Sequence, residues 1–119
     1  MKQAQPKIVV EYIADVTVAT LTDERILDQG DIQALENSIM PLIEQAGAIK
    51  LVIDFCNVNF LTSAVLGLLI RASKRIYELG GQLKLCSINP KIFKIFKITR
   101  LHGVFDIYDD QEQAIQSFA

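Results

Sequence analysis

The sequence predicts an α/β fold in which helices pack on a small mixed β-sheet, with the element order β-β-α-β-α-β-α-β-α. Residues 51–55 (LVIDF) form a nearly continuous apolar run, which is typical of a parallel strand covered on both faces. Segments 32–43 and 65–79 carry apolar residues at the three-and-four spacing of amphipathic helices. Because helices alternate with the later strands, those strands are most simply parallel.

The N-terminal half begins with a hairpin. Residues 7–21 are mostly β-branched or aromatic and are interrupted at Ala14-Asp15, which predicts two short antiparallel strands. Polar residues 22–25 form a loop before the first helix. Pro41 lacks the amide hydrogen that the preceding turn needs, so we expect it to kink or divide this helix.

The C-terminal half has clear boundary signals. Gly80-Gly81 ends the second helix in the left-handed geometry that favours glycine, and residues 82–86 alternate as a strand. Asn89-Pro90 supplies a cap and a first-turn proline for a third helix that runs to about residue 99. Residues 104–108 predict a last strand, and Asp110 is placed to cap a short final helix.

Length and charge limit the possible functions. The 119 residues predict a single domain, with its core over about residues 7–118. A net charge of −2 and the lack of a basic block argue against direct nucleic-acid binding. No apolar run approaches the roughly 18 residues of a spanning helix, and the N-terminus lacks a signal-peptide core. We therefore expect a cytoplasmic protein without membrane insertion.

Motifs for catalysis and cofactor binding are missing from the sequence. Cys56 and Cys86 are far apart and accompany one histidine, His102, which excludes the usual zinc sets. We expect both thiols to be reduced and buried. No phosphate loop, dinucleotide turn or metalloprotease helix occurs. The sequence therefore predicts neither an enzyme nor a cofactor.

Segment 60–67 (FLTSAVLG), which joins the central strand to the second helix, is the candidate functional centre. Ser63 lies where the chain enters the helix, so its hydroxyl can be the N-cap or lie one residue from it. A phosphate there would add about −1.5 to −2 charges beside free amides and the positive end of the helix dipole. The simpler interpretation is that Ser63 is only a cap.

Two further features allow a structural or a functional interpretation. Asp54, near the carboxyl end of its strand, is expected to accept hydrogen bonds from loop amides around Asn57 or Ser63. Phe93 and Phe96 are expected in the core. A basic stripe beside them is either a solvated face or a surface for an acidic partner or a phosphoserine; it comprises Lys91, Lys94, Lys97 and Arg100.

Residues 51–55, 60–67 and the strand after Gly80-Gly81, in this order, resemble the STAS domain of bacterial anti-sigma factor antagonists. The resemblance spans roughly residues 7–118. It implies a protein that binds an anti-sigma factor with serine kinase activity and thereby regulates sigma-factor-dependent transcription without touching DNA. It further implies that the kinase phosphorylates Ser63, which switches off binding, and that a serine phosphatase reverses the reaction.

The resemblance also implies a partner-binding surface, made up of Asn57, Asn59, Thr62, Ser63, Ala64, Val65 and Arg71. The family commonly has aspartate just before the serine and glycine two positions after it, where this chain has Thr62 and Val65. Thr62 is therefore a second possible phosphate acceptor. The alternative function is a phosphorylation-independent scaffold subunit of a stressosome-like or lipid-transport complex, and a nucleotide-binding enzyme is a third hypothesis.

Overall fold

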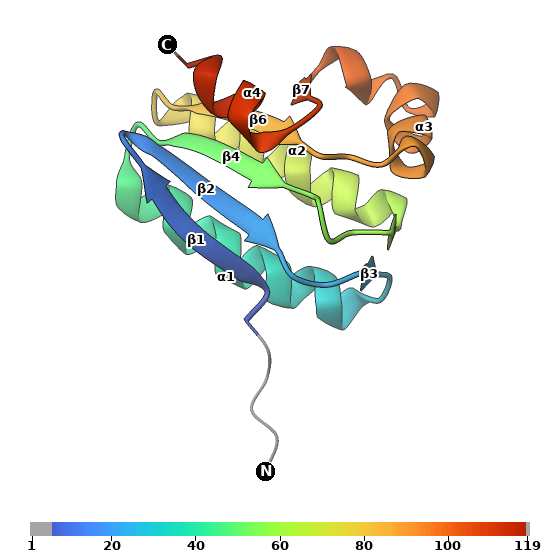
Figure 1. Cartoon of the computed structure of the whole chain (residues 1–119). Coiled ribbons are helices and arrows are strands. Elements are labelled where there is room, and N and C mark those ends of the chain that lie inside the picture. Colours follow the sequence, from blue (N-terminus) through green and yellow to red (C-terminus); the bar gives the residue numbers. More distant parts are fainter. Residues whose placement is uncertain (1–5, 119) are drawn as a thin grey trace.

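A five-stranded sheet forms the centre of the computed structural model, which describes residues 6–118 (Figure 1). Strand β1 pairs antiparallel with β2, and the remaining neighbours pair in parallel, in the order β1-β2-β4-β6-β7. The predicted mixed sheet is therefore confirmed. Its strands are β1 (Ile8–Ile13), β2 (Val16–Leu21), β4 (Lys50–Asp54), β6 (Gln82–Cys86) and β7 (Asp106–Tyr108).

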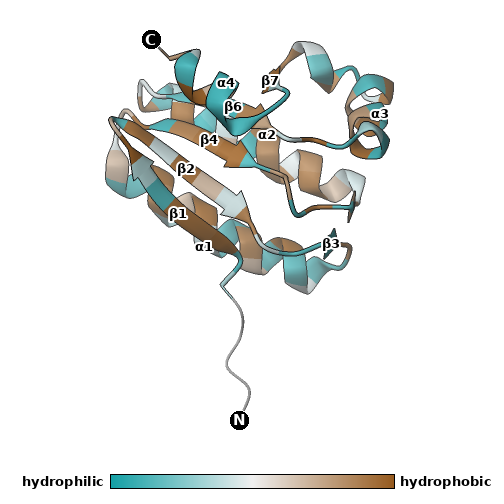
Figure 2. Cartoon of the chain, viewed as in Figure 1, coloured by the Kyte–Doolittle hydropathy of each residue, from teal (hydrophilic) through white to brown (hydrophobic). Residues whose placement is uncertain are grey.

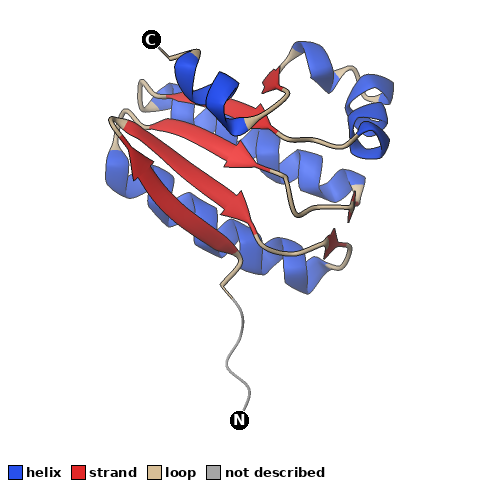
Figure 3. Cartoon of the chain, in the orientation of Figure 1, coloured by secondary structure: helices blue, strands red, loops and turns tan. Residues whose placement is uncertain are grey.

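Helices cover both faces of this sheet. Helices α1 (Gln29–Ala46) and α2 (Ser63–Glu78) lie side by side on one face, and α4 (Gln111–Gln116) lies on the other (Figure 3). Helix α3 (Pro90–Ile98) and a 3-10 turn (Leu101–Gly103) follow β6. Strand β4 lies in the middle, and Figure 2 shows it as largely hydrophobic. Burial on both faces explains its continuous apolar run.

Side-chain caps fix three helix starts. The Asn89 Oδ1 atom accepts a hydrogen bond from the Ile92 amide at 2.9 Å, and Asp110 Oδ1 accepts one from the Gln113 amide at 2.9 Å. Both caps were predicted. Asp28 caps α1 in the same way by accepting from the Asp31 amide at 2.8 Å. Each contact satisfies an amide that has no partner within its helix.

The two glycines after α2 serve different purposes. Gly80 has a φ of 81°, the left-handed geometry that was predicted. Gly81 instead allows close packing, because a Cβ atom there would lie 2.4 Å from the Ile49 carbonyl oxygen. The chain thus turns directly from α2 into β6 beside the residue that precedes β4.

The structure corrects the predictions at four points. Of the two alternatives at Pro41, division of the helix is wrong: α1 continues through the proline, and Ile39 and Ile43 on either side are fully buried in the core. The last strand begins at Asp106, two residues later than predicted. Cys56 is exposed, since it lies in the loop beyond β4, whereas Cys86 is buried. A second sheet was not predicted, and its parallel strands are β3 (Arg25–Ile26) and β5 (Phe60–Leu61).

Candidate functional site

The β3–β5 sheet fixes the entrance to α2. The amides of Asn59 and Phe60 both donate to the Glu24 carbonyl, at 2.7 and 3.1 Å. The Thr62 amide donates to the Ile26 carbonyl at 3.2 Å. These backbone bonds tie the segment on both sides of β5 to β3. The first residue of α2 therefore projects from a backbone that is held at several points.

Thr62 and Ser63 occupy different environments at this entrance. Thr62 is the N-cap residue, with extended φ and ψ of −91° and 163°, but its side chain makes no capping bond. Its Oγ1 atom is buried and has no hydrogen-bond partner among residues 6–118. Ser63 is the first helical residue and is exposed. The hydroxyl of Ser63 is thus open to a modifying enzyme, and that of Thr62 is not.

The first turn of α2 presents unpaired amides. The Val65 amide donates to the Thr62 carbonyl at 3.0 Å. Within the described part of the chain, the amides of Ser63 and Ala64 have no acceptor, and this turn contains no acidic side chain. The helix dipole adds partial positive charge at the same place. An anion on Ser63 would therefore meet a favourable local field.

The other residues predicted for partner binding are only partly accessible. Asn57, Asn59, Ala64 and Arg71 are exposed. Asn57 also donates its side-chain amide to the Leu21 carbonyl at 3.0 Å, which anchors the loop after β4. Val65 is fully buried because it faces the sheet from α2, so its assignment to the contact surface is wrong.

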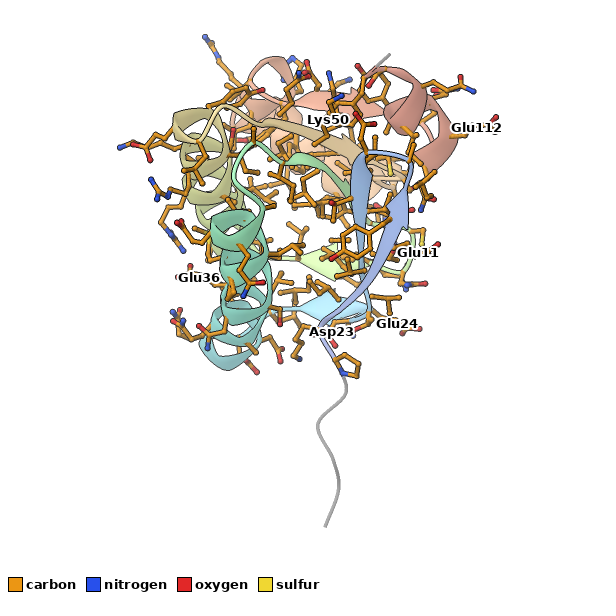
Figure 4. All side chains as sticks on the ribbon, turned by 90° about the vertical axis from the view of Figure 1, so that its left-hand side faces the viewer. Glu11, Asp23, Glu24, Glu36, Lys50 and Glu112 are labelled. Carbon is orange, nitrogen blue, oxygen red and sulfur yellow. The ribbon has the colours of Figure 1, made fainter. Side chains whose placement is uncertain are left out.

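Arg71 lies two turns after Ser63 on α2 and forms an ion pair with Glu36 of α1. Figure 4 shows Glu36 on the outer side of α1. The guanidinium group remains well exposed, with 58% of its side-chain surface accessible. Such an exposed pair adds little to stability. Arg71 is therefore available to a partner on the same face of the molecule as α1 and α2.

Asp54 has a structural position below this site. It is only 4% exposed, and its Oδ1 atom accepts from the Cys56 amide at 2.9 Å. Its Oδ2 atom accepts from the Gln111 side-chain amide of α4, also at 2.9 Å. The Cys56 bond confirms the predicted contact with a loop amide next to Asn57, whereas the Gln111 bond was not predicted. Asp54 thus connects β4, the following loop and α4. No feature of the sequence indicated that Gln111 would donate a hydrogen bond to Asp54.

The two thiols near Asp54 are not activated as nucleophiles. Burial raises the pKa of the Cys86 thiol to about 12. Partial desolvation, followed by the Asp54 carboxylate, raises the pKa of the Cys56 thiol. Thiols with raised pKa values carry little thiolate near neutral pH. Neither cysteine resembles a catalytic or redox-active residue.

Residues 6–118 contain neither a metal-binding cluster nor a membrane-spanning helix. No group of three or more His, Cys, Asp or Glu side chains in that range is arranged to hold a metal ion. None of the helices formed by these residues has both the length and the apolar character needed to cross a bilayer.

Comparison with known proteins identifies the family. Residues 7–114 match the STAS domain family. The anti-sigma F factor antagonist of Paenibacillus polymyxa is 24% identical over 109 residues, which cover 92% of each chain. An anti-sigma-factor antagonist (STAS) domain protein from Planctomyces limnophilus has a similar structure, with a TM-score of 0.85, 26% identity and coverage of 92% of this chain and 96% of the other.

A third similar protein is the Bacillus cell fate determinant SpoIIAA, whose structure is known in the phosphorylated form. It superposes with a TM-score of 0.69 at 21% identity and covers 94% of this chain and 99% of its own. The family match extends over most of the sequence and agrees with the fold. The chain therefore belongs to the STAS domain family, together with proteins named anti-sigma factor antagonists.

Proposed function

We propose that this chain is an anti-sigma factor antagonist that binds an anti-sigma factor with serine kinase activity. Phosphorylation at Ser63 switches off binding, a serine phosphatase restores it, and the cycle regulates sigma-factor-dependent transcription. The chain acts as a regulatory binding module and is the substrate of the kinase, not an enzyme itself. The names of its relatives support the role, and the existence of a phosphorylated form of SpoIIAA supports the switch.

The observation that carries the proposal is the exposure of Ser63 at the start of α2. A kinase needs access to the hydroxyl, and Ser63 provides it while the Thr62 oxygen is buried. The phosphoserine would lie beside the unpaired amides of the first turn and the positive end of the helix dipole. The fold can therefore carry the phosphate without being disrupted.

The switch then acts on the complex and not on the fold. A phosphate in a protein interface adds bulk, requires desolvation and repels acidic groups of the partner. These effects together are of the order of a few kcal/mol, enough to release the partner. The surface that senses the phosphate includes Asn57, Asn59, Ala64 and Arg71, which surround or follow Ser63 and are exposed.

A phosphorylation assay tests the acceptor. The purified chain is incubated with ATP and an anti-sigma factor of the serine kinase class, and the product is analysed by mass spectrometry. We expect one added phosphate on the wild type and on Thr62→Val, and none on Ser63→Ala. Phosphate incorporation into Ser63→Ala at the wild-type rate would show that the acceptor is elsewhere.

A binding assay tests the switch. We expect Ser63→Asp to weaken binding to the same partner by at least about tenfold, through repulsion and desolvation at the interface. Its circular dichroism spectrum and melting temperature should stay close to those of the wild type, because a negative charge is favourable at this helix end. Stable binding that neither Ser63→Asp nor phosphatase treatment changes would instead indicate the phosphorylation-independent scaffold.

A further inference from the structure

Phe60 is an exposed aromatic residue held between two cations. Its side chain is 44% accessible, although phenylalanine is usually buried. The Arg25 Cζ atom lies 5.2 Å from the ring centroid, and the Lys91 Nζ atom lies 5.3 Å from it. Arg25 and Phe60 are paired residues of the β3–β5 sheet, while Lys91 belongs to α3. We call these three residues the basic-aromatic patch.

Hydrogen bonds hold the parts of the patch in place. The Asn89 side chain caps α3 and also donates Nδ2 to the Val58 and Asn59 carbonyls, at 3.1 and 3.4 Å. This joins the start of α3 to the loop that precedes β5. A surface pocket of about 570 Å³ lies between them, lined by Asn59, Phe60, Asn89, Pro90 and Lys91. The patch is therefore a preformed feature of the surface.

The cations of the patch are not neutralised by the protein. Neither Arg25 nor Lys91 forms an ion pair with a carboxylate of residues 6–118, and both are exposed. Lys94, one turn further along α3, is also exposed and without an ion pair in that range. The patch thus carries a local positive charge on a chain whose net charge is −2. A carboxylate would complement it.

We propose that the basic-aromatic patch docks an acidic segment of the protein partner. A glutamate or aspartate of that segment sits near Arg25 and Lys91, and a neighbouring apolar group packs on the exposed ring of Phe60. This inference rests on the proposed function, since the partner is the same anti-sigma factor. It adds the chemistry that the partner must present and three contact residues.

The position of the patch also connects docking to the switch. Phe60 and Ser63 are separated by two residues, and both lie on the backbone that is tied to β3. A phosphate on Ser63 brings about −1.5 to −2 charges close to the docked carboxylate. Repulsion between the two anions weakens the complex. An acidic docking segment therefore makes the partner sensitive to phosphorylation.

Charge reversal tests the inference. The unmodified wild type and the Arg25→Glu/Lys91→Glu variant are titrated with the anti-sigma factor kinase in a calorimeter. Lys97→Glu is the matched control, because Lys97 is exposed on the same helix and holds its Nζ atom 5.5 Å from the Phe93 ring, away from the pocket. We expect Kd to rise by at least about tenfold for the double variant and by less than about twofold for the control.

The salt dependence and the folding controls complete the experiment. The difference between wild type and double variant should shrink as salt is added, because the exposed charges are screened. The melting temperatures of the double variant and of Lys97→Glu should each match that of the wild type. If the double variant is misfolded, Arg25→Gln/Lys91→Gln takes its place, and a rise in Kd of at least about threefold is expected.

The outcomes separate the two proposals. If the wild type binds and the patch variants bind equally well, the inference is wrong and the proposed function stands. Equal weakening by Lys97→Glu would likewise overturn it, because the effect would then be one of overall charge. If the wild type does not bind the kinase, the proposed function fails, and the inference fails with it.

Discussion

Thr62 and Ser63 both carry a hydroxyl group on neighbouring residues, yet only Ser63 is exposed, while the Thr62 oxygen is buried. The Thr62 amide is bonded to the Ile26 carbonyl, and this places the Thr62 hydroxyl oxygen in the interior. A threonine at an N-cap usually accepts a bond from an amide of the first turn, but this one does not. A buried hydroxyl without a partner costs about 1–3 kcal/mol.

This environment leads to a prediction for Thr62→Val. Valine replaces the unpaired hydroxyl with a methyl group of similar size and removes no capping bond, so the free energy of unfolding should rise by about 1 kcal/mol. Urea denaturation monitored by circular dichroism measures it. Ser63→Ala, at an exposed neighbouring position, should change stability by less than about 0.5 kcal/mol. A loss of stability in Thr62→Val would mean that the hydroxyl has a partner.

The distinction between the two hydroxyls could not be predicted from the sequence. Both were candidate acceptors, since the pattern indicated a helix start but not which side chain turned inward. The same applies to Val65, which was assigned to the binding surface although it faces the sheet. Local pattern places a residue near a helix end within about one or two positions. One position is enough to exchange an exposed side chain for a buried one.

At the level of elements, the length of a segment decided whether it could be predicted. The long helices show clear periodicity, the five main strands show β-branched, alternating or continuous apolar runs, and all of them were predicted to within a few residues. Strands β3 and β5 have two residues each, too few for any period, and they pair across a long stretch of sequence. This short sheet nevertheless positions Ser63 and the basic-aromatic patch. The β3–β5 sheet was therefore missed because it forms through tertiary contacts between distant segments and not through a local pattern.

The connection from α2 to β6 gives an element-scale prediction at Gly81. A Cβ atom at this position would lie 2.4 Å from the Ile49 carbonyl oxygen and 2.9 Å from the Ile49 nitrogen. Because these are backbone atoms of the segment leading into β4, they cannot move aside cheaply. We expect Gly81→Ala to lower the free energy of unfolding by about 3 kcal/mol, through strain between α2, β6 and β4.

Gly103 provides the control for this substitution. It lies in the 3-10 turn, and a Cβ atom there would have no atom within 4 Å. Gly103→Ala should therefore leave the urea midpoint nearly unchanged, or raise it slightly by restricting the unfolded chain. Equal stability of the two alanine variants would show that the packing at Gly81 tolerates a side chain.

At the scale of the whole molecule, the topology of the sheet brings the segments of the candidate site to one edge. Strands β2, β4 and β6 run parallel, so the segments that follow β2 and β4 and the start of α3 leave the same edge of the sheet (Figure 1). The sequence predicted this parallel arrangement, and with it the position of segment 60–67 between the central strand and the second helix. It did not indicate that Arg25, Phe60 and Lys91 would meet, because they belong to distant segments that share no motif.

Cys86 is buried in the sheet, and this burial makes the free energy of unfolding of the whole fold fall as the pH rises in the alkaline range. Burial raises the pKa of its thiol from the ordinary value of 9.0 to about 12. Above about pH 9 the unfolded chain loses this proton while the folded chain keeps it, so the unfolded state binds fewer protons. The stabilising contribution is complete below this pH and declines as the pH rises, by about 1.4 kcal/mol per pH unit.

Urea denaturation between about pH 8 and pH 10, under reducing conditions, measures this contribution. We expect Cys86→Ala to be less stable at neutral pH, because it leaves a small cavity, but to lose less stability than the wild type over this range. Cys56→Ala is the matched control: its thiol is exposed, so the variant should retain most of the wild-type slope. All other side chains are the same in the three proteins, so their contribution to the pH dependence cancels in the comparison. Identical slopes for Cys86→Ala and the wild type would mean that the Cys86 thiol ionises as readily in the folded protein as in the unfolded chain.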